Sequence, residues 1–228
     1  MHFIVWLKGA PKFDPDSPES ARKVQEFVDR FVTTVNNGDA TLQIHKHTAT
    51  CIRRRRTRGQ QSNQRNQERA RIRLGANEDC RFGIPFLPFK STTILNPLPN
   101  IDDKDKKEHR LKMRRIKQFL EHCRIEGQDI TFEEFLDKVD MTEAEYTTTI
   151  RASLISAKLF LRRSVSSAFV NGYNSRIVQL FSSNMDIQFI VDEFAVATYL
   201  CSYISKGALN YRNLIFVCLT DLNFCFFQ

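Results

Sequence analysis

The sequence has little of what marks a secreted or membrane-spanning protein. Its six cysteines are scattered along 228 residues instead of forming the dense framework of a small disulfide-rich domain. The apolar start of the chain is too short for a signal peptide and carries no basic leader. No run before residue 208 is apolar and long enough to cross a bilayer. We therefore expect an intracellular protein in a reducing compartment, with no membrane partner.

A phosphate-binding loop is also missing. The Walker pattern G-x-x-x-x-G-K-[ST] occurs nowhere, so the sequence predicts no ATPase of its own. Positive charge is plentiful instead: the net charge is +8 and the pI is near 9.3, which favours an acidic partner such as nucleic acid. Residues 45–75 contain ten lysines and arginines against one acid, Glu68, so this segment carries +9 and the remainder about −1.

The most basic stretch, residues 53–73, is a polar, low-complexity linker. Four consecutive arginines open it: Arg53, Arg54, Arg55 and Arg56. We expect them to contact nucleic-acid phosphates without regard to base sequence. They also suit a solvated loop or a nuclear-import signal, and we predict a nuclear location. Arg162 and Arg163 end a strand predicted at 158–163, where they either meet a phosphate or form a charged strand edge.

Two histidines and two cysteines stand in the same part of the chain. His45, His47 and Cys51 lie close together in the sequence IHKHTATC, and Cys80 follows the basic linker. Zinc binds four ligands drawn from histidine nitrogen and thiolate sulfur, so these residues could supply a closed site. The spacing is not that of a standard zinc finger, because the second half offers one cysteine instead of a C-x-x-C pair. Free thiols and solvated histidines are the other interpretation.

Residues 184–207 read as a short strand followed by a helix. Apolar and polar side chains alternate over 185–191, as they do in a half-buried strand. Asp192 is a candidate N-cap for the helix, and Gly207 is a candidate stop signal. The pattern therefore predicts a strand–helix unit near the C-terminal end.

Tyr199 and Tyr203 are four residues apart on that predicted helix. This spacing puts both phenols on one face, with Cβ atoms roughly 5–6 Å apart. A tyrosine oxygen can attack a DNA phosphodiester, and Lys206 nearby would lower the phenol pKa and balance charge on phosphorus. Core packing is the alternative, because the helix has a broad apolar surface and tyrosine often lies at such a border.

The sequence N-M-D-I-Q-F at 184–189, followed by Y-x-x-x-Y-I-S-K at 199–206, resembles the tyrosine motif of Helitron-type transposases. The replication-initiator domain of that family is a rolling-circle endonuclease of the HUH class. The resemblance extends from residue 1 to about Gly207. It includes a His/Cys cluster ending in C-R-F-x-I-P, where the family usually has an aromatic residue in place of Ile84. The implied fold is α+β, an antiparallel metal-site sheet flanked by helices, with a helical insertion.

The resemblance implies a single-strand DNA endonuclease and strand transferase. Tyr199 and Tyr203 would be the nucleophiles that form a 5′-phosphotyrosine link, and Mg²⁺ or Mn²⁺ would polarise the scissile phosphate. His2 corresponds to the second histidine of the family's metal motif, and Gln188 is a candidate third ligand. The first histidine would precede Met1, so we expect an impaired nuclease.

Other interpretations remain open for these residues. Without the resemblance, His2 is an ordinary N-terminal residue and Gln188 a polar residue on the solvent side of a strand. In the family this domain is normally fused to a DNA helicase, which is the implied partner along with single-stranded DNA. The rival function is a non-catalytic DNA- or RNA-binding module that keeps the basic segment and the fold.

The sequence divides into five segments. Residues 1–44 contain a strand and a helix, 45–98 the basic His/Cys segment and a Pro/Phe-rich extended stretch, 99–156 the helical insertion, 157–207 a strand and the two-tyrosine helix, and 208–228 an apolar tail. The tail is either a last strand or an unnatural end of the reading frame. N-cap signals at Ser17, Thr131 and Thr142 predict three helix starts, and a fourth helix is expected to extend to about Cys123.

Overall fold

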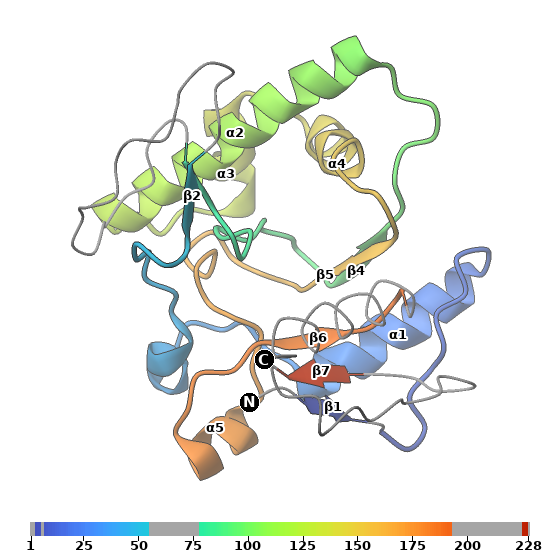
Figure 1. Ribbon diagram of the computed structural model, residues 1–228, viewed down its shortest axis with the longest axis vertical. Coiled ribbons are helices and arrows are strands. Elements are labelled where there is room, and N and C mark those ends of the chain that lie inside the picture. Colours follow the sequence, from blue (N-terminus) through green and yellow to red (C-terminus); the bar gives the residue numbers. More distant parts are fainter. Residues whose placement is uncertain (1–2, 6, 55–77, 193–224, 228) are drawn as a thin grey trace, which may run out of the picture.

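The computed structural model describes residues 3–5, 7–54, 78–192 and 225–227 (Figure 1). The helices are α1 (Pro18–Phe31), the 3₁₀ helix η1 (Gly38–Gln43), α2 (Asp103–Glu126), α3 (Phe132–Val139), α4 (Glu143–Arg151) and α5 (Ser175–Phe181). The strands are β1 (Phe3–Val5), β2 (Ile52–Arg54), β3 (Glu78–Cys80), β4 (Thr93–Leu95), β5 (Lys158–Phe160), β6 (Ile187–Phe189) and β7 (Cys225–Phe227). The mixture of helices and antiparallel strand pairs is compatible with the expected α+β class.

The predicted helix starts are confirmed by their capping hydrogen bonds. The Ser17 hydroxyl accepts the N–H of Ser20, with a proline in the first turn of α1. Thr131 and Thr142 each form a full capping box with the glutamate three residues later. These bonds satisfy backbone donors that a helix leaves without partners in its first turn, so short sequence signals fix where α1, α3 and α4 begin.

One half of the molecule is built on the three-stranded sheet, in the order β1-β7-β6. β7 lies in the middle and is antiparallel to both neighbours, so Phe227 pairs with Phe3 on one side and with Ile187 on the other. Helix α1 lies beside this sheet (Figure 1). It packs buried valines, including Val24 and Val28, into the same apolar cluster as Ile187 and Phe189. The tail thus contains a strand at 225–227, whereas 208–224 lie outside the described residues.

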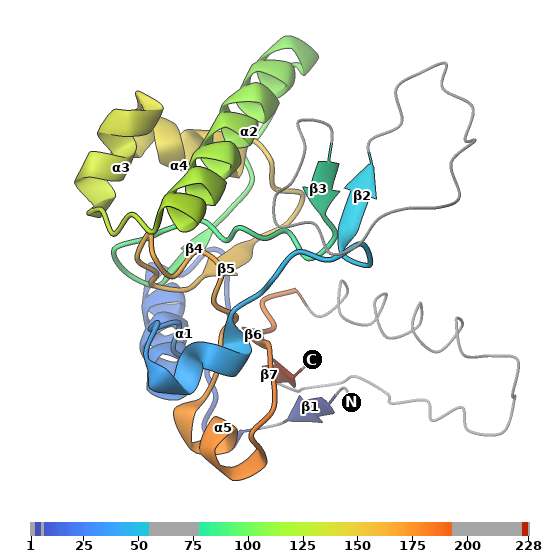
Figure 2. The same cartoon turned by 90° about the vertical axis from the view of Figure 1, so that its left-hand side faces the viewer.

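The other half is the helical block of α2, α3 and α4. Its core contains Ile116 and Leu120 of α2 together with Phe135 of α3, and the buried Cys51 and Cys80 belong to the same cluster. Figure 2 shows the β2–β3 pair standing beside α2. The sequence segments 45–98 and 99–156 therefore share one core. No helix among the described residues is long and apolar enough to cross a membrane.

The extended Pro/Phe-rich stretch is tied to the helical block by a buried tyrosine. Tyr146 of α4 is fully buried, and its hydroxyl donates a hydrogen bond to the carbonyl oxygen of Pro88 at 3.0 Å. Its ring lies 5.7 Å from that of Phe135, nearly perpendicular to it. The Tyr146 side chain thus holds the 82–98 stretch against α3 and α4.

Tyr146→Phe is expected to lower the free energy of unfolding by about 1–2 kcal/mol, because the buried Pro88 carbonyl loses its donor. Urea unfolding followed by circular dichroism measures this change. Thr148→Ala, which removes an exposed hydroxyl from the same helix, should change stability by less than about 0.5 kcal/mol. Equal stability of Tyr146→Phe and the parent protein would contradict the proposed role of this hydrogen bond.

Candidate metal centre

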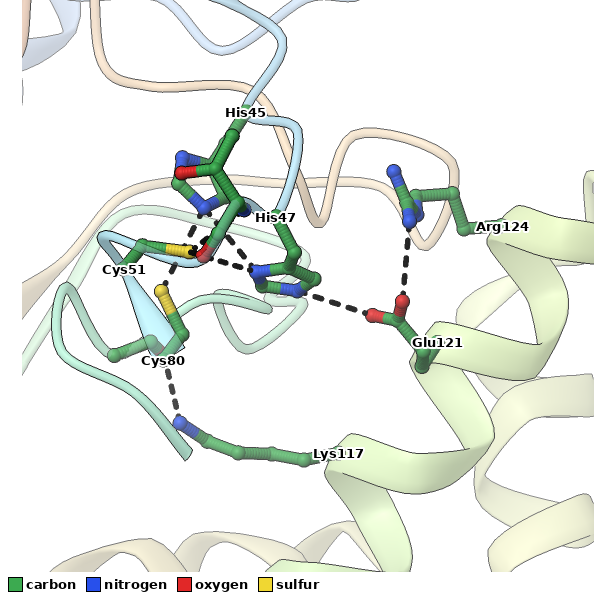
Figure 3. Close-up of polar contacts among 9 residues, drawn as sticks. His45, His47, Cys51, Cys80, Lys117, Glu121 and Arg124 are labelled. Carbon is green, nitrogen blue, oxygen red and sulfur yellow. Dashed lines mark hydrogen bonds and ion pairs between the residues drawn. The ribbon is translucent and has the colours of Figure 1, made fainter. Parts of the chain in front are cut away.

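Three side chains from residues 45–51 converge with that of Cys80 beside α2 (Figure 3). We call His45, His47, Cys51 and Cys80 the His/Cys cluster. The histidines follow η1, whereas the cysteines are brought together because β2 and β3 pair antiparallel, with Ile52 opposite Cys80. The four possible ligand atoms all lie within 4.8 Å of one another, and three of the residues are buried. The predicted ligands are thus brought together, and they could hold a metal ion.

The atoms facing the centre of the cluster are identified by their short separations. His45 Nε2 lies 3.2 Å from His47 Nδ1, Cys51 Sγ lies 3.5 Å from the same Nδ1, and Cys80 Sγ lies 3.6 Å from His45 Nε2. Each residue therefore directs one donor atom at a common point. Buried groups of this kind are costly unless they bind each other, a proton or a cation.

Backbone amides surround both sulfur atoms. Thr48 donates its N–H to Cys51 Sγ at 3.2 Å, and the amides of Phe82 and Ile84 donate to Cys80. Burial alone would raise the pKa of Cys80, but hydrogen bonds from the cluster histidines and these amides lower it to about 5. The lowered pKa favours the thiolate of Cys80, which is the form that binds metals.

Helix α2 contributes a residue that the sequence analysis did not identify. Glu121 is 3% exposed, and its Oε2 lies 3.3 Å from His47 Nε2, the imidazole nitrogen that faces away from the cluster. The other carboxylate oxygen contacts Arg124 Nη2 at 3.1 Å. Burial lowers the pKa of His47, but contacts with Cys80, Glu121 and Cys51 raise it to about 10. A carboxylate behind a histidine is typical of metal ligands, whose second ring nitrogen it orients.

Glu121 could not have been found from spacing alone. It follows Leu120 at the border of the apolar face of α2, where a charged residue is ordinary. Only the packing of α2 against the His/Cys cluster distinguishes it from the exposed acids of the same helix. This contact also shows that the predicted helical insertion touches the cluster directly.

Some of the other predicted site residues lie within the described part of the chain, and the rest lie outside it. Gln188 is exposed on β6, opposite in direction to the buried Ile187 and Phe189, and its amide donates to Asp186 Oδ2 at 2.8 Å. The backbones of Arg53 and Arg54 lie in β2. Six predicted site residues lie outside the described residues: His2, Arg55, Arg56, Tyr199, Tyr203 and Lys206.

Arg163 does not lie at the surface, where the predicted contact with a phosphate requires it to be. It is 6% exposed, and its Nη1 donates to the carbonyl oxygens of Ser167, at 2.7 Å, and Val170. The guanidinium lies 4.4 Å from the centroid of the Phe86 ring. These contacts make Arg163 a structural residue that holds the 164–170 loop, whereas Arg162 is exposed.

No known protein family, curated protein or solved structure matches the chain.

Arg163→Gln is expected to lower the free energy of unfolding by about 2–3 kcal/mol, because two buried carbonyls lose a charged donor. Arg162→Gln is the matched control on the neighbouring exposed residue and should change stability by less than about 0.5 kcal/mol. Thermal and urea unfolding measure both effects. Similar small losses in the two variants would contradict the structural role of Arg163.

Proposed function

We propose that this chain is a DNA strand-cleaving domain of the rolling-circle replication-initiator type, similar to that of Helitron transposases and organised around a structural zinc centre. The observation that carries the proposal is the motif N-M-D-I-Q-F followed by Y-x-x-x-Y-I-S-K. The sheet supports it: β6, from the first part of the motif, and β1, which closely follows His2 in the chain, are both partners of β7. A nuclear location and a linked helicase belong to the same proposal.

Zinc is the metal that best fits the His/Cys cluster. For zinc–nitrogen bonds of about 2.05 Å and zinc–sulfur bonds of about 2.3 Å, a tetrahedron requires nitrogens about 3.3 Å apart and nitrogen–sulfur separations of about 3.6 Å. Three of the six separations in the cluster are close to these values: 3.2 Å between the nitrogens, and 3.5 and 3.6 Å for two nitrogen–sulfur pairs. All six lie within 4.8 Å. Magnesium and calcium prefer oxygen ligands, so the donor set argues against them.

The zinc centre proposed here is structural. Four protein ligands fill a tetrahedral ion and leave no open position for water or substrate. The ion would join the segment after η1 to β2 and β3, and through the Glu121–His47 contact it would also fix α2. The ion would thus add stability to this basic part of the chain, because the β2–β3 strand pair is short.

Cleavage is assigned to the tyrosine pair. The phenol oxygen of Tyr199 or Tyr203 would attack phosphorus as the bond to the 3′ oxygen breaks, which gives a 5′-phosphotyrosine link. Lys206 would balance the charge that develops on phosphorus. A divalent cation, Mg²⁺ or Mn²⁺, held by His2 and Gln188 would polarise the phosphate.

A second candidate function is binding of DNA or RNA without cleavage. Residues 45–75 contain ten lysines and arginines, which favours this function. Such a segment binds phosphates whether or not the tyrosines cleave DNA. The two functions differ in one product, a covalent protein–DNA adduct.

The purified protein is expected to contain one zinc ion, which Cys51→Ser and Cys80→Ser each remove because a tetrahedral site loses a thiolate ligand. Native mass spectrometry and elemental analysis measure the metal content. Cys123→Ser is the matched control, since Cys123 is a buried cysteine of α2 outside the cluster. Full zinc content in Cys80→Ser would rule out the assigned ligand set.

Glu121→Gln extends the same experiment to the residue behind His47. The variant keeps the shape of the side chain but loses the charge, so zinc affinity should fall roughly 10–100-fold. Competition with a chelating dye measures this, and Glu126→Gln, at an exposed position of α2, should bind zinc as the parent does. An unchanged zinc affinity in Glu121→Gln would show that Glu121 of α2 does not support the metal centre.

Incubation with labelled single-stranded DNA and Mn²⁺ is expected to give a weak covalent adduct on a denaturing gel. The adduct should disappear in the double variant Tyr199→Phe/Tyr203→Phe, because no phenol oxygen remains to attack phosphorus. Tyr211→Phe, outside the motif, is the control and should leave the adduct unchanged. Salt-sensitive retention of DNA with no adduct in the parent protein would favour the second candidate function.

A further inference from the structure

The residues after Cys80 form a tight turn that is fixed from two sides. Gly83 donates its N–H to the Cys80 carbonyl at 3.0 Å and has a φ of +77°, in the left-handed region that glycine favours. The amides of Phe82 and Ile84 donate to the Cys80 sulfur. From the other side, Lys117 of α2 donates from Nζ to the Gly83 carbonyl at 2.7 Å (Figure 3). The turn is therefore held both by the His/Cys cluster and by α2.

This turn presents an aromatic ring and a guanidinium to solvent. Phe82 is 41% exposed, and the guanidinium carbon of the exposed Arg81 lies 4.6 Å from the centroid of its ring. The imidazole of His45 packs edge-on at 5.7 Å between ring centroids. A phenylalanine ordinarily moves into the core, but the fixed backbone keeps this ring at the surface. Rings and guanidinium planes of this kind stack on unpaired nucleic-acid bases.

The face of α2 that meets the cluster continues as a basic stripe. Lys117 and Glu121 make the contacts with the turn and with His47. Arg114, Arg110 and Lys107 precede them at intervals of three and four residues, which places all five on one side of the helix. The stripe from Lys107 to Arg114 extends about 10 Å along the helix axis.

The three basic residues of the stripe are available to an anion. Lys107 and Arg110 are exposed, and Arg114 is partly exposed with a buried Nε that has no hydrogen-bond partner among the described residues. None of the three forms an ion pair within the described ranges. By contrast, two lysines on other faces of α2 are paired: Lys106 with Asp103 and Lys112 with Glu108.

We propose that the Arg81–Phe82 turn and the basic stripe of α2 form one binding surface for single-stranded DNA. A base stacks on Phe82 and Arg81, and the backbone phosphates follow Arg114, Arg110 and Lys107. Stacking at the turn selects unpaired bases, whereas the stripe supplies affinity that does not depend on base sequence. The assignment of single-stranded DNA as the ligand rests on the proposed function, but binding at this surface does not require Tyr199 or Tyr203.

The test is fluorescence anisotropy with a labelled 20-nucleotide oligothymidine and the full, zinc-loaded chain. Phe82→Ala should weaken binding about 10-fold or more, because the base no longer has a ring to stack on. Arg110→Gln/Arg114→Gln should reduce the slope of log affinity against log salt by about 1.4, or about 0.7 for each phosphate that is no longer neutralised. Arg176→Gln, an exposed arginine on α5, is the matched control and should bind like the parent.

Zinc content measured on each variant distinguishes damage to the binding surface from damage to the fold. Unchanged binding in Phe82→Ala with full zinc content would overturn the stacking site, as would preferential binding of duplex DNA, whose paired bases are covered. Tighter binding of oligouridine would overturn the assignment to DNA. Loss of binding in these variants supports the surface even if no covalent adduct forms. Unchanged binding in these variants, together with a normal adduct, would leave cleavage intact and refute this surface.

Discussion

The contact between His47 and the buried carboxylate of Glu121 is the constraint on which the arrangement of the molecule depends. His47 belongs to a segment that otherwise has little regular structure, whereas Glu121 lies on α2, the longest helix in the described part of the chain. A carboxylate that is 3% exposed is costly unless charges and donors surround it. Here His47 and Arg124 surround it from two sides, so the helical block and the His/Cys cluster are held together at their shared core.

The sequence is most informative where structure depends on neighbours in the chain. Ser17, Thr131 and Thr142 mark helix starts because capping bonds join residues only three apart. The His/Cys cluster is also predictable, since few side chains bind metals and four of them stand in one part of the sequence. Their convergence confirms that they could hold a metal ion.

The parts that could not be predicted depend on contacts between distant segments. The sequence pattern places Arg163 at the exposed end of a strand, but the loop that follows folds back and surrounds its guanidinium with carbonyls. Glu121 has the pattern of an ordinary border residue of an amphipathic helix. In both cases a charged residue is expected at the surface, but the polar groups around it in the fold allow its side chain to be buried. The structure thus distinguishes the exposed Arg162 and the basic stripe of α2 from charged residues such as Arg163 and Glu121, whose contacts lie within the fold.

The position of β7 has a consequence for how the protein acquires its sheet. β1, near the start of the chain, hydrogen-bonds to β7, near its end, and β6 uses the opposite edge of the same strand. During synthesis β1 therefore cannot pair with β7 until the residues between the two strands have left the ribosome. Such distant pairing is slow to form. The helical block and the His/Cys cluster use only residues made earlier, so they are able to fold first and serve as a platform for late closure of the sheet.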